Sequence, residues 1–101
     1  MSDKSSIDSV LIGRGKRYGE FKDGAEIMQS LKKVMHNTKG WESLSSSQKE
    51  SLEMIQHKIA RILNGDPNYD DNWIDISGYS KLVVDELNKK RKTIYACNQT
   101  A

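Results

Sequence analysis

Carboxylates spaced one helical turn apart are the residues of this chain whose types and spacing could do chemistry. Glu50 and Glu53 form such a pair, and Asp75 follows on the next apolar-periodic segment. Mg²⁺ prefers oxygen ligands and usually bridges to substrate phosphates. Two facing helices that each contribute carboxylates can build such a cage. We therefore predict Glu50, Glu53 and Asp75 as Mg²⁺ ligands, with Lys58 and Arg61 facing the phosphate of a ligand.

The same carboxylates also have ordinary structural roles. Ser47 followed by Glu50 matches a capping box, with serine at N-cap and glutamate at N3. Glu53 and His57 are spaced as an i,i+4 pair. Asp75 can pair with Lys58 or Arg61 of the preceding helix, and in an antiparallel hairpin Lys58 is expected at about the height of Asp75. Ion-pair networks of this kind commonly imitate active sites. The sequence leaves the structural and the metal-binding interpretations open.

A glycine-punctuated basic segment is the second candidate site. Arg14, Lys16, Arg17 and Tyr18 lie within GRGKRYG, where three glycines permit a turn. Backbone N–H groups of such a turn, beside basic side chains, can cradle a phosphate, and Tyr18 could stack on a base. The segment has a G-x-G, but it lacks a glycine at the third position of the G-x-G-x-x-G dinucleotide pattern and it has no preceding strand. Its basic residues could equally be solvated charges at a helix end.

Helices must position these residues, because the apolar spacing is helical throughout and no convincing strand can be found. We predict an all-α fold in a single domain, 1–101. Its centre is an antiparallel hairpin of helices at about 47–64 and 71–91. Trp41 and Trp73 each lie near a helix start and are expected to be hydrophobic staples or core anchors. Gly78, inside the last helix, is expected to allow close approach of a neighbour. The other two helices are expected at about 6–13 and 23–36. The two tails, about 1–5 and 93–101, are expected to be frayed.

Composition narrows the classes of function. Sixteen basic and fourteen acidic side chains give a net charge of +2, too balanced to favour nucleic acid. No apolar run approaches the roughly 20 residues of a membrane span, and the polar N-terminus has no secretory h-region. The single cysteine, Cys97, cannot form an internal disulfide. We expect a cytoplasmic protein with no membrane partner.

Two segments, IGRGKRYGEF and LEMIQHKIARILNGDPNYDDNWIDISGYSKLV, resemble a family of small phage and prophage proteins of unknown function. The shared pattern is R-G-x-x-Y-G-[DE]-F, then K-I-x-R, an N-G turn and W-x-D-I-x-G-Y-x-x-L. It covers residues 10–85. The resemblance implies a phage accessory protein in a bacterial host cell, and it implies no particular activity.

A more distant likeness is to the MazG-like, all-α nucleoside triphosphate pyrophosphatases. These carry E-x-x-E on one helix and E-x-x-D on the next, holding Mg²⁺. Glu50, Glu53 and Asp75 match three of the four positions, and Asn72 replaces the remaining glutamate. The departure removes one anionic ligand, so the likeness implies nucleotide binding more than hydrolysis. Such enzymes act as dimers or tetramers, which implies a homo-oligomer here.

Three hypotheses of function follow. The first is binding of a nucleotide or another phosphorylated small molecule with Mg²⁺ at the hairpin. The second is a helical interaction module that docks on a host protein through an exposed apolar patch, for which Trp41, Met28, Met35 and Met54 are candidates. The third is nucleic-acid binding through the basic clusters at 14–17 and 89–92, which the near-neutral charge disfavours.

Overall fold

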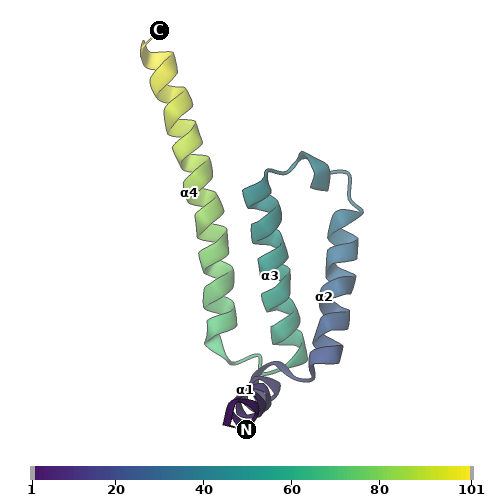
Figure 1. Cartoon of the computed structure of the whole chain (residues 1–101). Helices are drawn as coiled ribbons and strands as arrows, with labels where there is room; N and C mark the ends of the chain where they lie inside the picture. Colours follow the sequence, from purple (N-terminus) through teal and green to yellow (C-terminus); the bar gives the residue numbers. More distant parts are fainter. Residues whose placement is uncertain (1, 101) are drawn as a thin grey trace.

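The computed structural model describes the backbone of residues 2–100 and the side chains of residues 6–91. Within this part the chain forms four α-helices and no strand, which confirms the all-α prediction (Figure 1). The predicted frayed tails, 1–5 and 93–101, lie outside the residues with described side chains and stay a prediction. The helices are α1 (Ser2–Tyr18), α2 (Phe21–His36), α3 (Ser46–Asn64) and α4 (Asp70–Thr100), with a 3-10 turn η1 (Trp41–Ser43) before α3.

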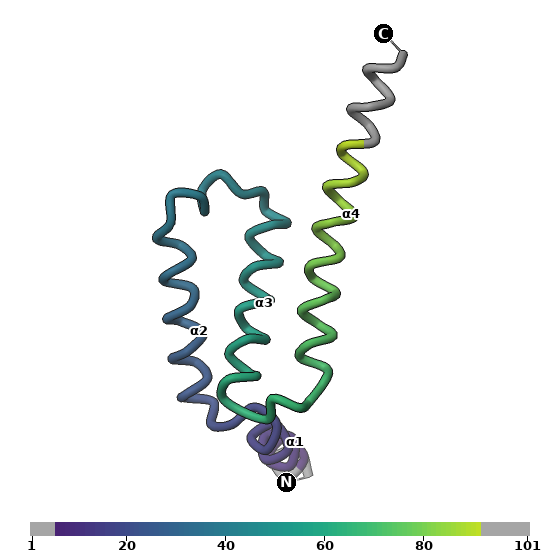
Figure 2. The backbone as a smooth tube through the Cα atoms, turned by 180° about the vertical axis from the view of Figure 1, so that it is seen from behind, coloured from purple at the N-terminus to yellow at the C-terminus, as the bar shows by residue number. Residues whose placement is uncertain are grey.

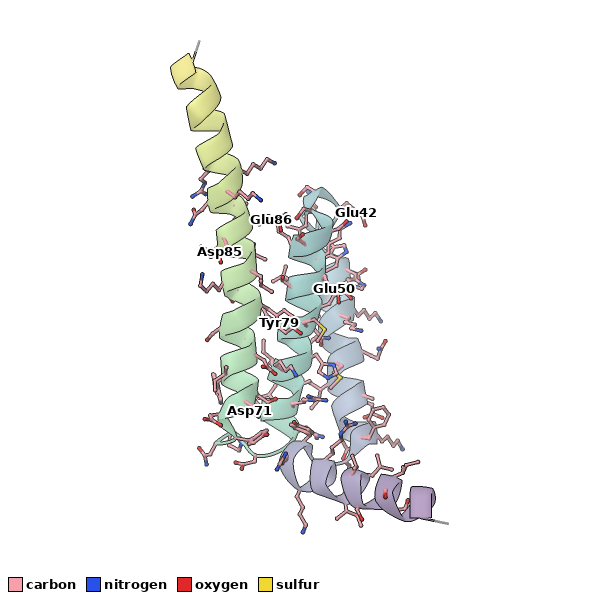
Figure 3. The ribbon with its side chains drawn as sticks, turned by 60° about the vertical axis from the view of Figure 1, so that its left-hand side comes forward. Glu42, Glu50, Asp71, Tyr79, Asp85 and Glu86 are labelled. Carbon is pink, nitrogen blue, oxygen red and sulfur yellow. The ribbon has the colours of Figure 1, made fainter. Side chains whose placement is uncertain are left out.

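Three of the helices lie side by side in one layer. α3 stands between α2 and α4 and runs antiparallel to both, as the views from the front and from behind agree (Figures 1 and 2). The α3–α4 hairpin predicted from the sequence is therefore confirmed. α1 lies at the end of this layer where α2 begins and α3 ends, and it projects out of the layer across the axes of the other helices (Figure 3). The Cα radius of gyration is 18.5 Å, well above the roughly 13 Å of a compact chain of about 100 residues.

The start of α3 differs from the prediction by two residues. Ser45, not Ser47, is the N-cap: its Oγ accepts from the Gln48 backbone N–H at 3.1 Å, and the Gln48 side chain accepts from the Ser45 N–H at 2.9 Å. This reciprocal pair is a capping box, because it satisfies two backbone donors at the helix start. Glu50 therefore has no capping role.

The glycine-rich segment is helix rather than a phosphate-binding turn. α1 continues through Gly13 and Gly15 to Tyr18, so the backbone N–H groups of this stretch belong to the helix and the predicted nest is wrong. The turn comes later, at Gly19, whose φ of 77° lies in the region that favours glycine. The Asn64 Nδ2 donates to the carbonyl oxygens of Tyr18 at 2.8 Å and Glu20 at 2.9 Å. The end of α3 thereby holds the α1–α2 turn.

The interior of this layer is small. Among the residues with described side chains, Trp41 and Ala60 are the only buried hydrophobic ones. Trp41 is a core anchor as predicted and packs against the His36 ring at 4.6 Å between centroids. Its burial excludes it from an exposed docking patch. Trp73 is half-exposed, so of its two predicted roles that of a core anchor is wrong; its indole N–H donates to the Pro67 carbonyl at 2.9 Å.

Gly78 does not mark a close approach, because a Cβ built there would meet nothing within 4 Å. In the described part of the chain, no helix combines the length and the apolar character that crossing a lipid bilayer requires.

Candidate functional site

Asp75 and Lys58 form an ion pair between α4 and α3. The Asp75 Oδ2 lies 3.0 Å from the Lys58 Nζ. Lys58 is the more enclosed partner, with a side chain only 12% exposed. This contact is the structural alternative anticipated for Asp75, and it withdraws Lys58 from any phosphate-binding role at the hairpin.

Glu53 turns the other way, toward α2. Its Oε1 lies 3.1 Å from the His36 Nε2, so the expected pairing with His57 is replaced by one across the helices. Glu50 is exposed and lies away from α4 (Figure 3). The three carboxylates proposed as Mg²⁺ ligands thus do not converge, since they sit on different sides of the hairpin. Within the described residues, no three His, Cys, Asp or Glu side chains form a group that could hold a metal ion.

The predicted ligand-binding residues do converge elsewhere, in an open groove at the junction of α1, α2 and α3. Its volume is about 740 Å³. Arg14, Lys16 and Tyr18 of α1 line it together with Arg61 of α3, so a groove that the hairpin hypothesis did not foresee collects four of the six residues. Residues that were not predicted as ligand-binding also line it: Leu11, Ile12, Phe21, His57, Asn64 and Met28, the last of which was a candidate for an exposed docking patch.

Arg17 has a structural position instead. Its guanidinium stacks on the Tyr69 ring at 4.8 Å from the centroid, and its Nη1 donates to the Tyr69 hydroxyl at 3.3 Å. The Arg17 carbonyl accepts from the Asp66 backbone N–H at 2.7 Å. The Tyr69 hydroxyl donates to the Asp71 carboxylate at 2.6 Å, and this hydrogen bond raises the pKa of Tyr69. These contacts fasten α1 to the α3–α4 loop.

The groove is electropositive at its α3 wall. The Arg61 guanidinium lies over the Tyr18 ring, 4.1 Å from its centroid, a cation–π contact that orients both side chains. Burial lowers the pKa of His57, and the positive charges of Arg61, Lys58 and Lys32 lower it further. At neutral pH the imidazole is therefore uncharged and can donate or accept a hydrogen bond.

Helical periodicity gives the layer two different sides. On α3, His57 and Arg61 point toward the side from which α1 projects, whereas Leu52, Ile59 and Leu63 point the opposite way. The second side is strongly apolar, and Leu63 is 67% exposed on it. A shallow hollow of about 310 Å³ between α3 and α4 opens there. We call the following residues the apolar face: Ile27, Leu31 and Val34 of α2, Leu52, Ile59 and Leu63 of α3, and Ile76, Val83 and Leu87 of α4.

Asp75→Asn is expected to destabilise the fold by about 1–2 kcal/mol. That range lies between the values for exposed and fully buried ion pairs, because Lys58 is enclosed while Asp75 is half-exposed. Urea unfolding followed by circular dichroism measures the change. Asp85→Asn is the matched control, because its partner Lys81 is exposed one turn away on the same helix. Equal stability of D75N and D85N would contradict a structural role for Asp75.

Comparison of the chain with protein families, with curated proteins and with solved structures finds no match. The resemblances to phage proteins and to MazG-like enzymes therefore stay predictions.

Proposed function

We propose that this protein is a helical interaction module that works as a homodimer, with two copies joined through the apolar face. The proposal rests on one observation, which is that far more large hydrophobic side chains are exposed than are buried. Thirteen large hydrophobic side chains are exposed among the described residues, against two hydrophobic residues buried, and four of the thirteen belong to the apolar face: Val34, Leu52, Ile59 and Leu63. A helix buries its apolar stripe against a second layer of structure, and a single layer of three helices leaves one side without that layer.

A second copy suits this face because the face is uncharged along α3 and α4. The polar residues that line the hollow between α3 and α4 on this side carry no charge either: Gln48, Ser51 and Ser80. In a two-fold interface the same patch meets itself, so any charge near the axis would face a like charge. An uncharged patch avoids that repulsion, in a chain of which 30% of the residues are charged.

The size of the face also fits a dimer. α3 has 19 residues, which corresponds to a length of roughly 28 Å. Three helices packed roughly 9 Å apart then offer roughly 700 Å² per copy. Stable interfaces bury roughly 800 Å² per partner. The dimer would leave α1 of each copy on the outer sides, available to a further partner.

Sedimentation velocity of the full chain tests the proposal. We expect a reversible monomer–dimer equilibrium at micromolar concentrations, with a sedimentation coefficient that rises with loading. The association constant should be insensitive to salt, because apolar burial rather than charge drives it. A single monomeric species at every concentration up to roughly 1 mM would overturn the proposal. A dissociation constant of roughly 1 mM corresponds to a binding free energy of only about 4 kcal/mol.

A further inference from the structure

We propose that the groove between α1, α2 and α3 binds a small molecule that carries an anionic group on an apolar or aromatic body. The site is independent of the proposed dimer, because it lies on the opposite side of the layer. It also differs from the hairpin site expected from the sequence, since it needs neither Glu50, Glu53 and Asp75 nor a metal ion.

The anionic part follows from the charges around the groove. Arg14 and Lys16 approach it from α1 and Arg61 approaches it from α3, so the cations come from two elements rather than from one solvated run. In the described part of the chain, none of these three side chains forms an ion pair with a carboxylate. Glu20, at the start of α2, is the single acidic residue of the lining. Guanidinium groups bind phosphate and carboxylate through paired N–H donors.

The apolar part follows from the other wall. Leu11 and Ile12 of α1 face the groove with Met28 of α2, and Phe21 stands at its edge with 87% of its surface exposed. The Tyr18 ring, already covered by Arg61 on one side, adds an aromatic surface. A volume of about 740 Å³ lies in the range of small-molecule sites, which are mostly apolar with a few placed polar groups.

His57 supplies a signature that a nonspecific surface would not give. Charged groups approach it from all the surrounding elements, and a bound anion would offset the repulsion that the cations exert on the protonated imidazole. The pKa of His57 should therefore rise on binding. The charged groups at or around the groove are Arg14 and Lys16 of α1, Glu20 before α2, Lys32 of α2, and Lys58 and Arg61 of α3.

Nitrogen–proton correlation spectra of the full chain test the inference, with four probes: hexyl phosphate, AMP, adenosine and inorganic phosphate. We expect saturable shifts at groove residues with hexyl phosphate, AMP or both, which distinguishes an aliphatic from an aromatic body. Inorganic phosphate should bind about tenfold more weakly than the tighter-binding of the two organic phosphates, because it has the anionic group without the apolar or aromatic body. Adenosine should not bind, because it has the aromatic body without the anionic group. Inorganic phosphate binding as tightly as both organic phosphates would overturn the inference.

Arg61→Gln is the informative variant, and Arg91→Gln on the far part of α4 is its matched control. Loss of a charged hydrogen bond should weaken binding about tenfold or more in R61Q and leave R91Q unchanged. Lys16→Gln, which removes an exposed side chain, gives the same readout if R61Q disturbs the fold. Absence of saturable shifts for both organic phosphates, or unchanged affinity in both R61Q and K16Q, would overturn the inference.

The ring signals of His57 give a second readout. Hexyl sulfate is the probe, because its charge stays constant over the pH range of the titration. The pKa of His57 should rise when hexyl sulfate is added. The anion should therefore bind more tightly as the pH falls and His57 becomes protonated, and the His57→Gln variant should lose this gain in affinity. An unchanged pKa at saturating hexyl sulfate would place the ligand away from His57 and contradict the site.

Discussion

Gly19→Ala should lower the free energy of unfolding by about 3 kcal/mol or more. The backbone φ of 77° costs a residue with a Cβ about 1–3 kcal/mol. An alanine Cβ would also run into the backbone carbonyl of Asn64, which cannot move aside as a flexible side chain can. Asn64 is itself held by its two hydrogen bonds to the turn. Chemical denaturation followed by circular dichroism measures the loss.

Gly13→Ala is the matched control for this change. Gly13 lies inside α1, and a Cβ added there would meet nothing within 4 Å. The substitution should therefore stabilise the helix by about 0.5–1 kcal/mol, through the lower conformational entropy of alanine in the unfolded chain. The free energy of unfolding should therefore rise in G13A and fall in G19A, and this difference in sign distinguishes a helix interior from a turn. Destabilisation of similar size in both variants would contradict the helical path of residues 13–15 and restore the turn expected from the sequence.

Ile59→Glu should convert the proposed dimer into a monomer. Ile59 lies in the middle of the apolar face and is 38% exposed in a single copy, so a glutamate there keeps access to water when the chain is alone. In the dimer two carboxylates would be desolvated close to the two-fold axis, without partners. Each buried unpaired charge costs several kcal/mol, so the dissociation constant should rise about 100-fold or more. Sedimentation velocity at matched concentrations measures it.

Ile74→Glu is the control for this experiment. Ile74 is on α4 and is 58% exposed, and its helical position points away from α3. I74E introduces the same side chain and the same charge on an outer surface, so it should dimerise as the unaltered chain does. Circular dichroism should show equal helix content for both variants. A monomeric I74E beside a dimeric I59E would place the interface on the outer side of α4 and refute the assignment to the apolar face.

Local periodicity was enough to predict four helices and the central hairpin, but it ended the first helix at about residue 13, whereas α1 continues to Tyr18. The register of the Lys58–Asp75 pair also followed from it, because a short loop fixes which residues of two antiparallel helices stand at the same height. The α3 start could not be determined in this way. Ser45-x-x-Gln48 and Ser47-x-x-Glu50 both match the capping-box pattern, and only the path of the chain from η1 selects the first.

The carboxylate cluster failed as a prediction of geometry for a tertiary reason. Glu53 is four residues from His57, but its partner is His36, seventeen residues away on α2. Spacing along one helix carries no information about which neighbouring helix a side chain meets. The groove was missed for the same reason, since Arg61 and Tyr18 are distant in sequence and meet only because Asn64 holds the α1–α2 turn.

The glycine segment illustrates a different limit. Gly13 and Gly15 each weaken a helix by roughly 1 kcal/mol, which favours a turn when the segment is considered alone. The structure nevertheless continues α1 through both, and the turn falls at Gly19, where Asn64 and Asp66 supply tertiary hydrogen bonds. Composition thus predicted that a turn exists and misplaced it.

Contacts between two copies would show most directly whether a second chain covers the apolar face, as we propose. A sample mixed from carbon-13-labelled and unlabelled chains allows isotope-filtered NOE spectra that record only contacts between copies. We expect such NOEs from the methyl groups of Leu52, Ile59 and Leu63 to the partner chain. Intermolecular NOEs confined to α1, or none from a chain that stays monomeric at millimolar concentration, would contradict it.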